Sequence, residues 1–241
     1  MSQLDEPSRS LREVNCEARR QRILEAARTL IARGGVQALS MRKLALEAGV
    51  SVTTLYNLFG VRNAILAALV HDAIDRIDQI LEDEAPLDDP IERCRAVITV
   101  SVRYIGDQEA VFRPMVLTLY QGLLLGGIER PDTSERAAHM QQVAIEKAIA
   151  EGLLRDTLDP GVLASQIYHG YDLACCQWAY GLIDTAGFRA RALYGLYVAL
   201  LAVATDQIRP MLEGELGKLE AELGGLRGQP PRPKSTLSAG P

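Results

Sequence analysis

The sequence predicts an all-α fold. Of its 241 residues, 48% are apolar but only 5% are aromatic, and Ala and Leu are abundant. Val and Ile do not gather into the alternating runs of β-strands, whereas apolar residues recur at the three- and four-residue spacing of helices. A chain of this length forms one large domain or two small ones.

The first fifteen residues lack apolar periodicity, and residues 1–15 are predicted to be a disordered N-terminal arm. The first helix is expected over 17–33, with a stop at the following glycine pair, Gly34 and Gly35. Five arginines lead into it: Arg9, Arg12, Arg19, Arg20 and Arg22. Such a basic arm either contacts nucleic-acid phosphate or is a solvated tail, and composition leaves both readings open.

Residues 40–60 predict two short helices joined by a tight turn. Ser40 and Ser51 are good N-caps, and Gly49 can adopt the left-handed conformation that stops the first helix. The two helices are expected at 41–48 and 52–58. Apolar side chains on their facing sides can bury one another: Leu44, Ala45, Ala48, Val50, Leu55 and Phe59. This is a helix-turn-helix, so residues 16–70 are predicted to form a three-helix DNA-binding domain.

The outward face of the second short helix argues against the alternative, an ordinary helical hairpin. That face carries short hydrogen-bonding or methyl-bearing groups, with no carboxylate: Val52, Thr53, Thr54, Tyr56 and Asn57. A solvated face would normally carry Glu and Lys.

The predicted contacts with DNA divide by role. Methyl and amide groups suit base edges in the major groove, so Val52, Thr53 and Asn57 are the base-reading candidates. Hydroxyls and cations near helix N-termini suit phosphate oxygens. The phosphate candidates are Arg42, Thr54, Tyr56 and Arg62. The capping residues Ser40 and Ser51 complete the predicted DNA-binding set.

At these residues the sequence resembles the TetR family of bacterial one-component repressors. The similarity runs from about Arg20 to about Val70 and includes Ser40-Met41-Arg42-Lys43-Leu44-Ala45, Gly49-Val50-Ser51, Thr54-Leu55-Tyr56 and Phe59. The resemblance implies a small-molecule pocket within the C-terminal helices. It also implies that ligand binding moves the helix expected at 62–81 and changes the spacing of the DNA-reading heads.

Charge is divided unevenly along the chain. The net charge of −5 argues against a general nucleic-acid binder. Residues 1–70, however, hold ten Arg and Lys against six Asp and Glu, whereas the remainder holds sixteen against twenty-five. A basic head on an acidic body fits a protein whose N-terminal end alone approaches phosphate.

Residues 71–223 are predicted to form a helical effector-binding and dimerisation domain, and residues 224–241, rich in Pro and Gly, a disordered tail. The helices that follow the DNA-binding segment are expected at 62–81, 91–105, 114–124, 135–152, 162–183 and 188–212. Pro114 is expected to begin its helix. The acidic stretch 83–90 is expected to be a linker and 128–134 a loop.

The last two of these helices predict a homodimer. They mix bulky with small residues, and residues 193–204 are apolar nearly all round. A helix of this kind must be covered on every side, and we expect a partner subunit to contribute through a two-fold, four-helix interface. A buried internal helix is the alternative. Because a symmetric dimer reads an inverted repeat, the operator is expected to be palindromic.

Several aromatic and polar residues of the larger domain are candidates for the pocket, since pockets combine apolar walls with few polar anchors. The predicted ligand-binding residues are Tyr104, Phe112, Met115, Tyr120, Tyr168, Tyr171, Asp172, Cys175 and Trp178. The alternative for each tyrosine is a core position with a satisfied hydroxyl.

An enzyme is the main rival class. The chain lacks a phosphate-binding glycine loop, a nucleophile elbow and a metal-ligand constellation, and only His169 with Asp172 resembles an acid–base pair. We therefore expect no catalytic residues, no metal and no cofactor. The four cysteines show no disulfide framework, and Cys175 and Cys176 are expected to be small core residues, with thiol sensing as the alternative.

The sequence therefore predicts a ligand-responsive DNA-binding transcriptional regulator: a repressor that binds a palindromic operator as a dimer and is released by a small, largely apolar effector. An activator, or an effector-independent repressor, would share the same head. The polar N-terminus shows no signal peptide, and the longest apolar stretch, of twelve residues, is too short to span a bilayer. A cytoplasmic location with no membrane partner is expected.

Overall fold

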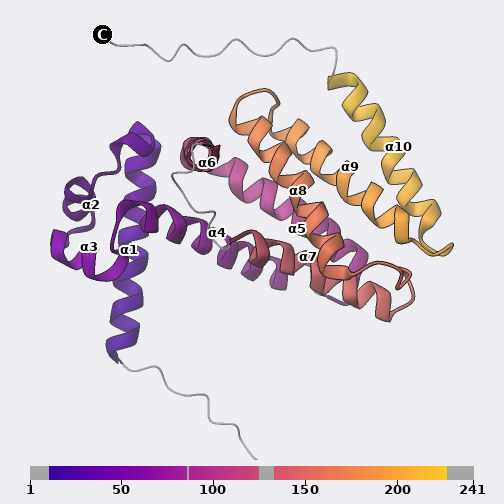
Figure 1. Ribbon diagram of the computed structural model, residues 1–241, viewed down its shortest axis with the longest axis horizontal. Helices are drawn as coiled ribbons and strands as arrows, with labels where there is room; N and C mark the ends of the chain where they lie inside the picture. Colours follow the sequence, from indigo (N-terminus) through magenta and orange to yellow (C-terminus); the bar gives the residue numbers. More distant parts are fainter. Residues whose placement is uncertain (1–10, 86, 125–132, 227–241) are drawn as a thin grey trace, which may run out of the picture. The chain divides into compact units, whose positions relative to one another are not determined.

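The computed structural model describes residues 11–85, 87–124 and 133–226 (Figure 1). In these residues the chain forms ten α-helices and one 3₁₀ helix, which confirms the all-α prediction. They are α1 (Leu11–Gly34), η1 (Val36–Ala38), α2 (Met41–Ala48), α3 (Val52–Phe59), α4 (Arg62–Glu84), α5 (Pro90–Asp107), α6 (Glu109–Leu124), α7 (Thr133–Ala150), α8 (Pro160–Ala179), α9 (Thr185–Val203) and α10 (Arg209–Leu226).

The chain divides into two compact units, Met1–Leu69 and Val70–Pro241. The division falls inside α4, one residue from the boundary expected from the sequence. We call the two parts the N-terminal unit and the C-terminal unit and describe each by itself.

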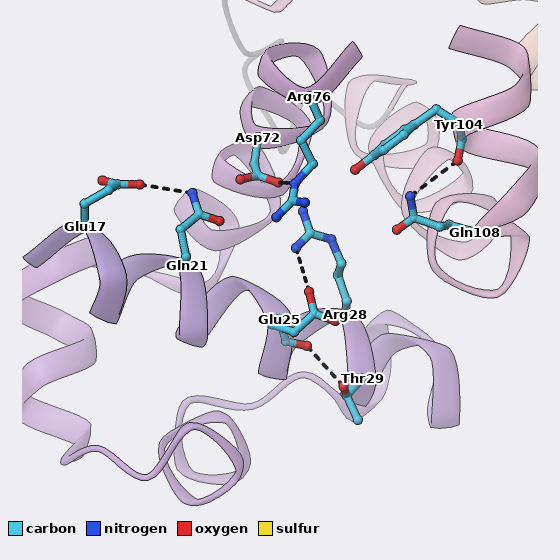
Figure 2. Close-up of polar contacts among 9 residues, drawn as sticks. All are labelled: Glu17, Gln21, Glu25, Arg28, Thr29, Asp72, Arg76, Tyr104 and Gln108. Atoms are coloured by element: carbon cyan, nitrogen blue, oxygen red, sulfur yellow. Dashed lines mark hydrogen bonds and ion pairs between the residues drawn. The ribbon is translucent and has the colours of Figure 1, made fainter. Parts of the chain in front are cut away.

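The N-terminal unit packs α1 against η1 and α2, and α2 against α3. The apolar stripe of α1 is almost completely buried at Ile23, Ala27 and Ile31. Polar contacts run along the same helix: Gln21 Nε2 donates to Glu17 Oε1 over 3.0 Å, and Arg28 pairs with Glu25 over 3.1 Å (Figure 2).

Both ends of the chain are more helical than the sequence indicated. Helix α1 begins at Leu11, so the predicted disorder of residues 11–15 is wrong; residues 1–10 lie outside the described part. Leu, Arg and Glu, which open this segment, are strong helix formers despite the missing apolar periodicity. Helix α10 continues to Leu226, so residues 224–226 are helical, while 227–241 lie outside the described part.

In the C-terminal unit, α9 is the central helix. It packs against α5, α8 and α10, and Figure 1 shows it between α8 and α10. Its side chains Phe188, Leu196 and Leu200 are fully buried in the largest core cluster. Of the helices in the described residues, α9 alone is by itself long and apolar enough to cross a membrane, but half of that apolar window is buried, as in a core helix.

The helix expected at 188–212 is two helices. Helix α9 ends at Val203, and Ala204 is extended and pairs with Leu154 in an isolated antiparallel bridge. Thr205 holds this break, because its N–H and its hydroxyl both donate to the Leu153 carbonyl, over 3.1 and 2.8 Å. The chain then reverses into α10, which covers one side of α9. The apolar surface of α9 is therefore explained largely by its own chain, the alternative raised above, and does not by itself require a partner.

Pro114 lies inside α6 rather than at its start. Helix α6 begins five residues earlier, directly after α5, where the Gln108 carbonyl accepts from the N–H groups of Val111 and Phe112. The proline is the sixth residue of the helix, past the first turn, so its missing N–H removes one intrahelical hydrogen bond. The predicted loop at 128–134 is wrong at its C-terminal end, because α7 already includes residues 133 and 134. Residues 125–132 lie outside the described part.

Candidate functional site

Helices α2 and α3 meet at a turn whose geometry the local sequence determines. The Ser40 hydroxyl accepts from the Lys43 N–H over 3.3 Å, and the Ser51 hydroxyl accepts from the Thr54 N–H over 3.1 Å. Gly49 adopts φ 62° and ψ 41°, the left-handed conformation, and its N–H closes the last turn of α2. Gly49 and Ser51 thus define the two helix ends that meet at the turn, and Ser40 caps the other end of α2.

The second helix of this pair has one buried side and one exposed side. Leu55 is fully buried and Phe59 is nearly so. Thr53, Tyr56 and Asn57 are exposed, and their spacing places them on one face of α3. This face offers a hydroxyl, a phenol and an amide to a partner and carries no charge. Such groups match the donors, acceptors and thymine methyl groups of the DNA major groove.

The remaining predicted contacts surround this face. Ser51 is exposed, whereas Val52 and Thr54 are half-buried, and the Thr54 hydroxyl hydrogen-bonds the Ser51 hydroxyl over 2.8 Å. Ser40 and Arg42 are exposed at the start of α2. The structure therefore gathers the base-reading candidates and their flanking caps on α3 and at its N-terminus.

Two cations differ from expectation. The Arg62 guanidinium donates to the Val36 carbonyl and its Nε is buried, so this side chain ties the start of α4 to η1. A phosphate contact from Arg62 stays a prediction, but the residue also has a structural role. Lys43, which is not among the predicted phosphate contacts, is exposed beside Arg42 in the first turn of α2. Its place next to a helix N-terminus was the signal that could have identified it.

The C-terminal unit contains a cavity of about 180 Å³ between α4, α5, α6, α7 and α8. Most of its wall is aliphatic or aromatic. The wall residues are Val70, Ala73, Ile74 and Ile77 of α4; Val97, Ile98, Ser101 and Ile105 of α5; Phe112, Met115, Val116, Leu119 and Tyr120 of α6; Ala137, Met140 and Gln141 of α7; and Ile167, Tyr168, Tyr171, Asp172 and Cys175 of α8.

Hydrogen bonds already engage much of the polar wall. The Ser101 hydroxyl donates to the Val97 carbonyl over 2.6 Å, and the Tyr120 hydroxyl donates to the Asp172 carbonyl over 2.9 Å. Gln141 Nε2 donates to the Cys94 carbonyl over 3.4 Å, whereas Gln141 Oε1 is buried without a partner. The cavity thus has few polar groups, and the Ser101 hydroxyl, the Tyr120 hydroxyl and the Gln141 amide nitrogen each have a defined acceptor.

Burial keeps three titratable wall groups uncharged. It raises the pKa of the Cys175 thiol, and it raises the pKa of the Tyr120 and Tyr171 hydroxyls well above their usual values. Because the thiolate is the reactive form of cysteine, burial makes Cys175 an unreactive core thiol, in line with its expected packing role. Neighbouring Cys176 is half-buried, and its pKa is also raised by desolvation.

Seven of the nine predicted ligand-binding residues line this cavity: Phe112, Met115, Tyr120, Tyr168, Tyr171, Asp172 and Cys175. The other two, Tyr104 and Trp178, do not. Whether any of the seven contacts a ligand stays a prediction.

Helix geometry explains the two exceptions. The face of α5 that lines the cavity includes Ser101 and Ile105, and Tyr104 lies beside this face. The Tyr104 ring packs edge-on against the Phe112 ring, with ring centres 5.8 Å apart. The Tyr104 carbonyl accepts from Gln108 Nε2 (Figure 2). Trp178 lies one turn beyond Cys175, fully buried, and its ring stacks on Phe188 at 5.9 Å.

The wall contributed by α4, α5 and α7 was missed. Gln141 could have been found, because it occupies a position in α7 that is in phase with the buried Ala138, Ala144 and Ile145. A glutamine on the apolar stripe of a helix indicates a buried polar group with a specific partner. The aliphatic wall residues carried no such signal, since they resemble any core residue.

Two observations on the described residues concern the metal and enzyme alternatives. No group of three or more His, Cys, Asp or Glu side chains there could hold a metal ion. His169 is exposed, whereas Asp172 lines the cavity, so the residues of the remote enzymatic alternative occupy different surroundings.

Comparisons with known proteins agree with this geometry. Residues 23–69, which span α1 to the first part of α4, match the family model of bacterial regulatory proteins, tetR family. An uncharacterised HTH-type transcriptional regulator of Mycobacterium tuberculosis is 34% identical over 91 residues, covering 37% of this chain and 45% of that protein. The HTH-type transcriptional repressor KstR of Rhodococcus jostii is 34% identical over 85 residues, covering 35% and 40%. The chain thus spans less than half the length of these two relatives.

Similarity to solved structures extends over both units. A TetR-family transcriptional regulator of Pectobacterium atrosepticum is 26% identical, with a TM-score of 0.59 over 82% of this chain and 99% of that chain. The helix-turn-helix geometry, the family match and this structural likeness lead to one assignment. Residues 23–69 form the DNA-binding domain of the TetR family of bacterial regulatory proteins, and the rest of the chain shares its helical fold with solved TetR-family structures.

Proposed function

We propose that the protein is a transcriptional repressor that binds a palindromic operator as a homodimer and is released by a small, largely apolar effector. The observation that carries this proposal is the exposed, uncharged face of α3, held by capped helix ends in a helix-turn-helix. Repression, rather than activation, is favoured by the likeness to KstR, which is named a transcriptional repressor. The protein would act in the cytoplasm, where operator DNA is accessible.

The proposed contacts with DNA follow the exposure of the side chains. Thr53 and Asn57 read base edges, with the Val52 methyl groups beside them. Tyr56, 53% exposed, and Arg42 contact phosphates. Ser40 and Ser51 position the helices through their caps. Thr54, through the Ser51 hydroxyl, and Arg62, through the Val36 carbonyl, help to hold the helices in place.

The proposed dimer surface lies on the outward sides of α8 and α9. Val162 and Leu173 on α8 are 70% and 60% exposed, and Val198 on α9 is 47% exposed. Between them Gly170 and Gly195 have no atom within 4 Å of the point where a side chain would begin. Exposed apolar side chains separated by glycines allow two helices of a second copy to approach closely, and two-fold symmetry is the commonest arrangement.

Helix α4 supplies the proposed link between effector and DNA. It begins at Arg62, with two residues between it and the end of α3. Further along α4, the side chains that line the cavity are Val70, Ala73, Ile74 and Ile77. An effector that favours a different position of α4 would change how the dimer presents its two α3 helices. The effector releases DNA only if it binds that second state more tightly than the DNA-bound state.

Selection of bound sequences from a random DNA pool tests the proposal. We expect enrichment of one inverted repeat whose half-sites lie about one helical turn apart or slightly more, because each α3 helix enters one major groove. Recovery of unrelated sequences with no repeat would contradict specific operator binding. A single half-site would retain DNA reading but contradict the dimer.

A further inference from the structure

The acceptor atom of Gln141 is a buried polar atom without a hydrogen-bond partner in the C-terminal unit. Gln141 is only 2% exposed, and its Oε1 has no hydrogen-bond partner. Among the described buried side-chain atoms without a partner, it alone belongs to a residue that lines the cavity. Leaving a buried acceptor unsatisfied costs free energy, and such atoms are rare in folded proteins. An atom of this kind in a cavity wall indicates a missing donor.

The orientation of the amide follows from its other contact. Gln141 Nε2 faces the Cys94 carbonyl at 3.4 Å, and a carbonyl can only accept. Rotating the amide by half a turn would place two acceptors against each other. The oxygen is therefore the atom that remains for a ligand.

Two other polar groups of the wall also present acceptors. The Ser101 and Tyr120 hydroxyls donate their hydrogens to backbone carbonyls, which leaves only oxygen lone pairs for the cavity. No Lys, Arg or His is among the wall residues that the structure describes. A carboxylate or phosphate in this cavity would have no cation to pair with, and burying an unpaired charge is costly. The wall also includes the Asp172 carboxyl group and the Tyr168 and Tyr171 hydroxyls, but most of it is apolar, so burying any charged ligand is costly. The cavity therefore suits a neutral donor.

We propose that the effector is a small, neutral, mainly apolar alcohol or phenol whose hydroxyl donates to Gln141 Oε1. This rests on the proposed function only in taking the cavity as the effector site. The volume of about 180 Å³ agrees with this class. An apolar protein cavity of about 150 Å³ is known to hold benzene, so a phenol with a short alkyl chain is of the right size.

Titration calorimetry with the full chain, in the absence of DNA, tests the ligand class. The probes are 4-ethylphenol and its methyl ether, which share an apolar body and differ in the single hydroxyl donor. We expect the phenol to bind about tenfold more tightly than the ether, which corresponds to about 1.4 kcal/mol. Gln141→Leu keeps a similar volume and removes the acceptor, so the two probes should then bind with equal affinity.

Gln142→Leu is the matched control, because it makes the same change at the next position of α7, where the amide bonds Glu146 and does not line the cavity. It should keep the tenfold preference. Gln141→Met provides a second acceptor-free variant if Gln141→Leu does not fold. Equal binding of both probes to the wild type, as when a water satisfies Oε1, would overturn the proposal. So would a preference that survives loss of Gln141, or no binding of the phenol at millimolar concentration.

Failure of this inference can be separated from failure of the proposed function. DNA release is measured independently, by fluorescence anisotropy of labelled operator. A Gln141-dependent preference for the phenol without DNA release would contradict regulation through this cavity but support the ligand class. Release by apolar molecules that lack a donor would support regulation and contradict the ligand class.

Discussion

The exposed face of α3 and the cavity of the C-terminal unit are built in opposite ways. The face of α3 comes from one eight-residue helix with a serine cap at one end and a glycine at the other. The cavity draws its wall from five helices that span more than a hundred residues of the chain. The first is a local structure whose function is written in consecutive side chains. The second exists only after distant helices have packed.

This difference separates two kinds of specificity. On α3, exposed hydroxyl and amide groups can be exchanged with little effect on folding, because they contact solvent in the free protein. In the cavity, wall residues such as Phe112 and Met115 are also core residues. A change there alters packing and ligand selection together. Substitutions should therefore separate binding from stability in the N-terminal unit and couple them in the C-terminal unit.

The largest expected effect concerns assembly. Leu173→Glu places a carboxylate on the exposed apolar face of α8 and should convert the proposed dimer to monomers, because a buried unpaired charge opposes association. Operator affinity should fall by about a thousandfold, toward the level of non-specific binding. Light scattering and anisotropy measure both quantities. Leu158→Glu, at a leucine exposed outside the helices, is the control and should remain dimeric with normal affinity. An unchanged mass for Leu173→Glu would remove α8 from the interface.

Burial of the Cys94 thiol in the C-terminal unit should change how the free energy of unfolding depends on pH. Desolvation raises the pKa of the Cys94 thiol to about 12, so the folded state binds its proton more tightly than the unfolded chain does. Above pH 9 the unfolded chain releases that proton first, and the free energy of unfolding should fall by about 1.4 kcal/mol per pH unit for this thiol. Urea titrations of Cys94→Ala between pH 8 and 10.5 should show a correspondingly smaller slope.

Cys16→Ala is the matched control, because it removes an exposed thiol from α1. It should keep the wild-type slope. A Cys94→Ala slope equal to that of the wild type would mean that this thiol is not desolvated in the folded protein.

In the N-terminal unit, the turn between α2 and α3 offers a smaller effect. Gly49 lies at φ 62°, where any other residue is strained although the space beside it is open. Gly49→Ala should therefore destabilise the unit by about 1–2 kcal/mol. Thermal unfolding measures this, with Gly214→Ala in α10 as a control whose backbone φ is not positive. Equal stability of Gly49→Ala and the wild type would contradict the left-handed turn.

The smallest effect is expected from one exposed cation. Arg42→Ala should weaken binding to all DNA sequences alike and reduce the slope of log affinity against log salt by about one unit. Arg42 is preferred to Arg62 for this test, because loss of Arg62 would also leave the Val36 carbonyl without its donor. Arg103→Ala, on exposed α5 surface, should leave the salt slope unchanged. A sequence-dependent loss for Arg42→Ala would indicate base contact instead of phosphate contact.

What the sequence could predict follows the same division. Ser40, Gly49 and Ser51 act within a few residues of themselves, so their caps and turn could be predicted from chain order alone. Tyr171 and Cys175 were found because aromatic and thiol groups in a C-terminal helix stand out. Ile74 and Val97 could not be found, because only the packing of α4 against α5 makes them neighbours in one wall.

Helix ends that depend on distant partners were likewise missed. The break after Val203 depends on pairing between Ala204 and Leu154, fifty residues apart in the chain. Without that pairing, residues 188–212 have the spacing of one continuous helix. Because one helix was predicted over 188–212, α10 was not recognised as a separate helix that covers the apolar surface of α9.

The most direct test of the account is the effect of Asn57→Ala on operator recognition, measured by anisotropy against the selected inverted repeat and each of its single base-pair variants. We expect a loss of about 10- to 100-fold on the repeat, with preference relaxed at one base pair in each half-site and binding to random DNA unchanged. Gln79→Ala, which removes an exposed amide from α4 in the other unit, should match the wild type. Equal losses on the operator and on random DNA, or no loss at all, would contradict base reading by α3.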